Sequence, residues 1–162
     1  MRAITLSDET GAPPIRVGAL TLAPADEAGE SAMEVTWDDA LFGDYFLSMR
    51  PFKCLEGAAQ LWCRAPYPYE NRRMISATDL TDLEYDLLFV WKPKGAYGID
   101  LWNGVYYRLS VAASGTIVGE LFDFDMNPLG VPPDAGNLRP LGPDDLTPGP
   151  ADGRWLPRIV IE

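Results

Sequence analysis

Short runs in which hydrophobic residues alternate with polar ones recur along the chain, and they predict strands. Residues 15–22 and 32–37 are two such β-prone runs, and the polar, glycine-containing loop between them is typical of a hairpin. Residues 45–49 and 61–64 continue the series around a turn near Gly57. The first part of the chain is therefore predicted to consist mainly of strands.

One helical turn interrupts this series. Residues 38–43 begin with two acidic residues and end with a glycine, which is the usual order of charge and termination in a short helix. We expect a single turn here, between two strands.

The clearest alternation lies between residues 83 and 91. Large hydrophobic residues occupy every second position there, namely Leu83, Tyr85, Leu87, Phe89 and Trp91. We interpret this stretch as a strand, because it finishes on β-forming residues and Pro93 would end it. A short helix is the alternative, because Thr81-Asp82-Leu83-Glu84 fits a capping box.

A second confident element is a hairpin. Residues 105–111 and 116–122 are β-prone, and Ser114-Gly115 between them supplies the turn. Residues 99–102, followed by Asn103-Gly104, are interpreted as one more strand, which would complete a three-stranded meander over residues 98–124.

The composition changes after Phe124. Eight of the 15 prolines lie between Pro128 and Pro157, so residues 126–154 cannot form a continuous helix or a central strand. We expect them to form an extended strap over the domain, and residues 155–162 are apolar enough to return as a terminal strand.

These elements predict a mainly β fold with little helix. We expect a single domain over residues 1–162, with core strands in 1–125, arranged as an antiparallel sandwich or a barrel-like sheet. The barrel is attractive because closure removes exposed edges and can create a ligand cavity.

The charge of the chain limits its partners. There are 13 basic and 24 acidic residues, and the net charge is −11. Such a field repels nucleic acids and anionic membranes, and no apolar run approaches the roughly 18 residues that cross a bilayer. The beginning of the chain lacks the apolar stretch of a signal peptide, so we expect a soluble, cytoplasmic protein.

The two cysteines, Cys54 and Cys63, are too few for a disulfide scaffold. We expect buried free thiols, although a hairpin turning near Gly57 would bring the two close enough for a bridge.

Much common chemistry is absent from this sequence. Without histidine the chain cannot form a Ser-His-Asp or Cys-His site or an imidazole metal site. Neither GxGxxG nor GxxxxGK[ST] occurs, so the usual nucleotide signatures are missing. We therefore predict no catalytic residues, no metal and no cofactor, and interpret the protein as non-catalytic.

Carboxylates are the plentiful chemical groups. Two groups are close in sequence: Asp79, Asp82, Glu84 and Asp86, and then Asp123 and Asp125. Pairs on one strand face could bind Mg²⁺ or serve a hydrolase, which gives a third functional hypothesis, a metal-dependent hydrolase. A solvated strand edge explains the same residues more simply.

The charge is distributed unevenly. Residues 1–44 contain 2 basic and 9 acidic residues, whereas residues 45–75 contain 5 basic and 2 acidic ones. Guanidinium groups bind carboxylate or phosphate, and tyrosine and tryptophan offer flat faces for aromatic ligands. Our leading hypothesis is a module that binds a small anionic or aromatic ligand through Arg50, Tyr69, Arg72, Arg73 and Trp102. The alternative is that these arginines pair with the protein's own acids at 79–86.

A second functional hypothesis belongs to another class. An acidic surface favours steered association with a basic protein, and outward aromatic rings would anchor it. The chain would then be an inhibitor or an immunity-type interaction protein.

Overall fold

The computed structural model describes residues 1–48 and 50–162, so Met49, the last residue of the strand expected at 45–49, lies outside the described residues. The described part contains twelve strands, one α-helix and five 3₁₀-helices. The strands are β1 (Arg2–Ser7), β2 (Ile15–Leu22), β3 (Ser31–Trp37), β4 (Gly43–Phe46), β5 (Pro51–Glu56), β6 (Gln60–Arg64), β7 (Met74–Ile75), β8 (Phe89–Pro93), β9 (Gly104–Val111), β10 (Ile117–Phe124), β11 (Thr147–Pro148) and β12 (Arg158–Ile161). The helices are η1 (Asp39–Leu41), α1 (Thr81–Asp86), η2 (Leu101–Asn103), η3 (Asn127–Gly130), η4 (Pro143–Asp145) and η5 (Ala151–Gly153).

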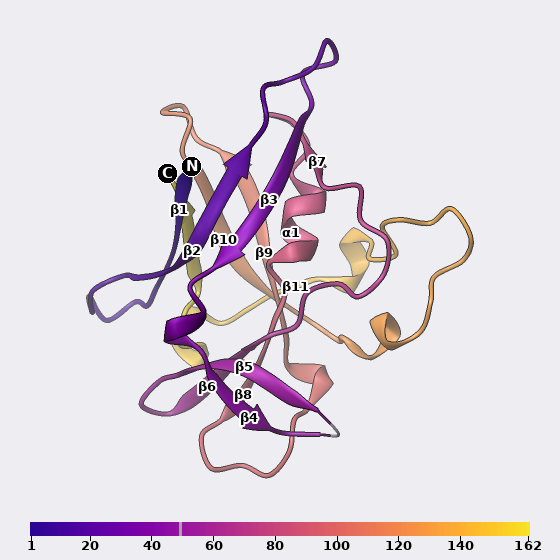
Figure 1. Ribbon diagram of the computed structural model, residues 1–162. Helices are drawn as coiled ribbons and strands as arrows, with labels where there is room; N and C mark the ends of the chain where they lie inside the picture. Colours follow the sequence, from indigo (N-terminus) through magenta and orange to yellow (C-terminus); the bar gives the residue numbers. More distant parts are fainter. Residues whose placement is uncertain (49) are drawn as a thin grey trace.

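One continuous antiparallel sheet contains all the described strands. Its order is β4-β5-β6-β8-β9-β10-β12-β1-β2-β3-β7, and β11 pairs with β10 beside this path. The prediction of a mainly β, antiparallel fold with little helix is confirmed. The sheet is strongly curved but not closed into a barrel, because its end strands β4 and β7 do not pair within the described chain (Figure 1).

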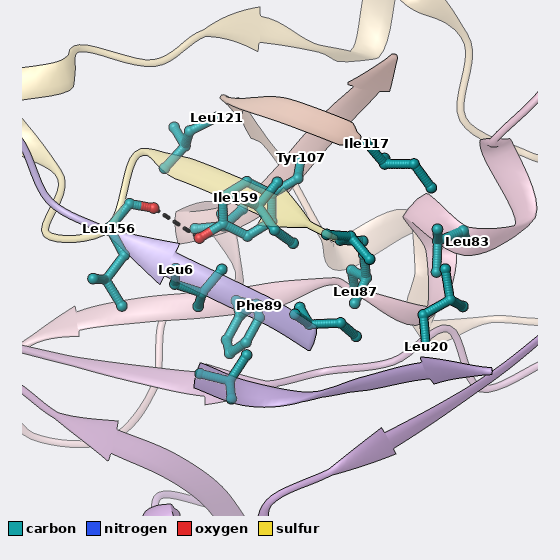
Figure 2. Close-up of a cluster of buried hydrophobic side chains, with 14 of the residues drawn as sticks. Leu6, Leu20, Leu83, Leu87, Phe89, Tyr107, Ile117, Leu121, Leu156 and Ile159 are labelled. Carbon is teal, nitrogen blue, oxygen red and sulfur yellow. Dashed lines mark hydrogen bonds between the residues drawn. The ribbon is translucent and has the colours of Figure 1, made fainter. Parts of the chain in front are cut away.

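The first hydrophobic cluster lies on the inner face of the curved sheet. Side chains from β1, β2, β8, β9, β10 and β12 meet there with leucines of α1, as Figure 2 shows. At its centre the hydroxyl of Tyr107 donates a hydrogen bond of 2.7 Å to the carbonyl oxygen of Leu156. Complete burial raises the pKa of Tyr107 well above its ordinary value, so this hydroxyl remains a donor.

The second cluster lies on the opposite face of the central strands and is covered by the proline-rich segment. Met126 and Leu129 are buried in it, and Leu141 and Leu146 pack against it. Its middle is a row of rings in edge-to-face contact, with centroid distances of 5.1 Å for Tyr67–Tyr85, 6.3 Å for Tyr85–Tyr106 and 6.1 Å for Tyr106–Phe124. The adjacent residues Tyr106 and Tyr107 thus point to opposite faces, and both are buried.

The prediction of a strand over residues 83–91 is wrong in its first half. Residues 81–86 form α1, the helix of the alternative interpretation, although its N-cap is Leu80 and no side chain caps it, and only Phe89–Pro93 is a strand. The five residues from Asp82 to Asp86 are all buried, so the segment has no solvent-facing side that would reveal the helical period. Alternation by two was therefore a misleading signal.

The first strand predicted for the meander is also wrong. Residues 101–103 form η2, and the Asp100 side chain accepts a hydrogen bond of 3.0 Å from the backbone N–H of Trp102. This local cap turns the chain into a helical turn. The hairpin predicted after it is confirmed as β9 and β10. The helical turn predicted at 38–43 is confirmed as η1.

Residues 155–162 were expected to return to the sheet. They contain β12, which lies between β10 and β1 in the interior of the sheet. Within the described residues no helix is long and apolar enough to cross a membrane.

The expectation of free thiols is wrong. Cys54 and Cys63 are directly opposite each other on β5 and β6, and they form a disulfide with an S–S distance of 2.04 Å. The turn near Gly57 sets this register, which the sequence left open.

Removing this disulfide is expected to destabilise the protein. The bond closes a loop of nine residues, for which the loss of unfolded-state entropy corresponds to about 2–3 kcal/mol. Urea unfolding of the Cys54→Ala/Cys63→Ala variant measures the difference. Thiol titration of the unreduced protein in denaturant is the control, and two reactive thiols there would contradict the bond.

Candidate functional site

A pocket of about 480 Å³ lies between two connections of the sheet. One connection joins β4 to β5, and the other joins β8 to η2; both lie at the lower end of the molecule in Figure 1. The residues that line it are Phe46, Leu47, Ser48, Lys92, Gly95, Ala96, Tyr97 and Gly98. This volume is within the range of small-molecule sites.

Lys92 is the unusual residue of the pocket. It lies on β8, where alternation puts Val90 and Lys92 on the face of the second cluster, and it is opposite Leu61 of β6. Its residue surface is only 5% exposed. The Nζ atom donates a hydrogen bond to the carbonyl oxygen of Ala96, in the same connection.

No carboxylate neutralises this ammonium group within the described chain. None of the ion pairs among the described residues involves Lys92. The nearest acid in the sheet register is Glu56, which is opposite Leu61 and thus two strands away, roughly 10 Å between Cα atoms. Lys94 binds Glu56 at 2.9 Å, and its hydrogen bond lowers the pKa of that carboxyl group.

Exposed aromatic rings occur at this end of the molecule. Phe46 and Tyr97 line the pocket and are 77% and fully exposed. The connection that carries Tyr97 turns at Gly95 and Gly98, whose φ angles of +91° and +68° favour glycine. The pocket therefore combines a buried cation with rings that are open to solvent.

Two of the five predicted ligand-binding residues lie in or directly after these connections. Arg50 is the last residue of the β4–β5 connection, and its guanidinium carbon lies 5.6 Å from the centre of the Phe52 ring. Trp102 is in η2 and is 69% exposed. Both lie close in sequence to lining residues, although neither lines the pocket itself.

The other three predicted residues lie beside α1 and the proline-rich segment. The Tyr69 hydroxyl points to the carbonyl oxygen of Gly130 at 3.4 Å. Arg72 pairs with Glu30 at 3.0 Å, and Arg73 pairs with Asp86 at 2.9 Å. The structure thus separates the five residues into two groups, and both arginines of the second group already bind carboxylates.

Arginines also bind most of the acidic residues that were considered for a metal or hydrolase site. Arg139, from the proline-rich segment, contacts Asp79 and Asp82, each at 2.9 Å. Its hydrogen bond lowers the pKa of Asp79. Arg154 binds Asp123 at 2.8 Å. Within the described residues, no group of three or more acidic or cysteine side chains could hold a metal ion.

Glu84 is a buried acid of a different kind. It accepts hydrogen bonds from the Tyr106 hydroxyl and from the backbone N–H of Leu109. Burial raises its pKa above the ordinary value in spite of these two donors. It is part of the second cluster's polar interior and faces neither of the two hollows described in this section.

A second hollow, of about 350 Å³, lies on the outer side of β2 and β3. Its charged residues, Arg16 and Asp38, are exposed, so no buried polar group is directed into it. The pocket at Lys92 is the better candidate for that reason.

Sequence reasoning missed Lys92. The signal was present, because continuing the alternation past Val90 puts a lysine on the same face as Leu88 and Val90. Ending the strand before residue 92 removed Lys92 from consideration.

Comparisons with protein-family models, with curated proteins and with solved structures found no match to this chain. Any proposal for its function is therefore argued from the chemistry of its own residues.

The arginine contacts lead to a stability prediction. Arg139→Met keeps the length of the stem but leaves Asp82, whose side chain is 4% exposed, without its counter-charge. We expect a loss of about 2–3 kcal/mol in the free energy of unfolding at neutral pH.

Arg158→Met is the matched control, because Arg158 and Glu9 are 57% and 40% exposed. Its expected cost is below about 1 kcal/mol. Urea unfolding of both variants makes the comparison, and equal losses would contradict a structural role for Arg139.

Proposed function

We propose that this protein is a non-catalytic binding protein and that a small anionic or aromatic molecule binds in the pocket at Lys92. The observation that carries the proposal is the buried ammonium group of Lys92, which has no internal counter-charge among the described residues. A buried charge is costly unless it is paired, so its retention is best explained by a ligand that pairs with it.

The surroundings of Lys92 support this proposal. Ligand sites are typically concave and combine apolar side chains with a small number of placed polar groups, and this pocket combines Lys92 with Phe46 and Leu47. Arg50 and Trp102 are available at the same end for the outer part of a ligand. Arg72 and Arg73 would have to leave Glu30 and Asp86 to take part, so we favour the pocket over the 69–73 loop.

The absence of histidine from the chain and the use of most candidate carboxylates by arginines favour binding over catalysis. The cytoplasmic location expected from the sequence stays a prediction. The Cys54–Cys63 disulfide favours an oxidising compartment instead, because glutathione and thioredoxin keep most cytosolic thiols reduced.

A blocking substitution tests the pocket. Ala96→Trp puts a large ring among the lining residues, so binding should be abolished. Amide chemical shifts of the ¹⁵N-labelled protein would be recorded with indole, phenylacetate, benzylamine and inorganic phosphate. We expect at least one of these probes to move the amide signals of Gly95, Ala96 and Gly98.

Ala113→Trp is the control, because Ala113 is exposed in the β9–β10 turn at the opposite end of the sheet (Figure 1). It should leave binding unchanged. If no probe moves the pocket amides, or if Ala96→Trp changes nothing, the proposal is wrong.

An acidic interaction protein is the second candidate function. Eight of the 13 basic residues are held in ion pairs among the described residues, so the outward field is dominated by the surplus acids. Such a field favours a basic protein partner. This candidate needs no ligand pocket.

The salt dependence of binding distinguishes this candidate. The amount of a basic partner that the immobilised protein retains should fall steeply between roughly 50 and 500 mM salt. At the upper concentration, exposed charges are screened within a few ångströms. Binding that is unchanged over this range would contradict electrostatic recognition.

A further inference from the structure

We propose that the pocket selects an aromatic monocarboxylate, with the carboxylate on Lys92 and the ring against Phe46 and Tyr97. This inference rests on the proposed function and names the class of its ligand.

The charge of the ligand follows from the lining. Lys92 is the single charged residue among the eight that line the pocket. One ammonium group balances one negative charge. A phosphate dianion would leave an unpaired charge in a protein whose net charge is already −11. The lining also lacks the arginine fork with which proteins commonly bind phosphate.

The hydrogen-bonding capacity indicates the carboxylate itself. An ammonium group has three donors, and the one protein acceptor found for Nζ among the described residues is the carbonyl oxygen of Ala96. The remaining two donors match the two oxygens of a carboxylate. Ser48, also in the lining, carries a hydroxyl that can donate a hydrogen bond.

The apolar part of the lining indicates a ring. The rings of Phe46 and Tyr97 are exposed to solvent: Phe46 is 77% exposed and Tyr97 is fully exposed. An aromatic ring would cover both and gain favourable face or edge contacts. Leu47 adds an aliphatic contact. A neutral sugar could stack on the rings but would leave the ammonium group unpaired.

Matched ligands test this assignment on the unaltered protein. Isothermal titration compares phenylacetate with phenylacetamide, which has the same ring and shape without the charge, and with inorganic phosphate. We expect phenylacetate to bind about tenfold or more tightly than either, because a charge-assisted hydrogen bond is lost in the amide.

A matched pair of variants locates the interaction. Lys92→Met keeps the aliphatic stem and should weaken phenylacetate binding about tenfold or more while leaving phenylacetamide binding within about twofold. Lys53→Met is the control, since Lys53 is a surface residue paired with Asp44, and it should change neither affinity. The comparison of the two ligands on the unaltered protein keeps the test valid even if Lys92→Met fails to fold.

The outcomes separate this inference from the proposed function. Equal affinity for phenylacetate and phenylacetamide at the pocket amides would overturn the monocarboxylate and leave the binding function standing. If phosphate binds more tightly than phenylacetate, the monocarboxylate is also overturned, and the ligand class becomes phosphate while the binding function stands. If neither the aromatic probes nor phosphate binds, both proposals fail.

Discussion

The central strands of this sheet must be covered on both faces, and the rest of the structure follows from that constraint. Along β8 the side chains of Phe89 and Trp91 belong to the first cluster, whereas Val90 belongs to the second, and β9 divides Tyr107 and Tyr106 in the same way. The curvature of the sheet covers one face. The other face needs a separate layer, and the proline-rich segment supplies it. Proline is suited to this layer because it has no backbone N–H, so it needs no hydrogen-bond acceptor on a neighbouring strand.

Buried charges on the second face are satisfied in two different ways. The covering segment brings Arg139 to the buried Asp82 of α1 and to Asp79, whose side chain is 47% exposed. Lys92 is buried on the same face, but there the cover comes from its own connection and from the β4–β5 connection, which contribute a carbonyl oxygen and no carboxylate. Among the described residues, Asp82 and Asp86 are paired with arginines and Glu84 is held by two hydrogen bonds, whereas the buried Lys92 has a carbonyl acceptor and no carboxylate. This asymmetry is the physical basis of the proposed site.

Much of the sheet could be predicted from the sequence, because strands that are half exposed alternate by two. The β9–β10 hairpin and the turn at η1 are examples. The prediction failed at α1, because a short helix with no exposed side does not show the helical period in its sequence. It failed again at Trp102, where the backbone N–H donates a hydrogen bond to the Asp100 side chain and the chain forms a helical turn. The candidate site was missed because its residues come from two separate connections, β4–β5 and β8–η2, and the sequence does not show that these lie side by side. Arg73 pairs with Asp86, one of the acids at 79–86 that the sequence offered as partners, whereas Arg72 pairs with the distant Glu30.

The pairing of β1 with β12 has a consequence for how the molecule reaches its native state. Ile4 lies opposite Ile161, so the middle of the sheet is assembled from segments at the greatest separations along the chain. Closing so large a loop costs entropy before any contact compensates for it, and folds dominated by such pairings form slowly, on a scale of roughly milliseconds to seconds. Until β12 arrives, β1 and β10 present unpaired edges that can capture the wrong strand or a second molecule. The high negative charge then serves assembly as well as solubility, because partly folded copies repel one another during that interval.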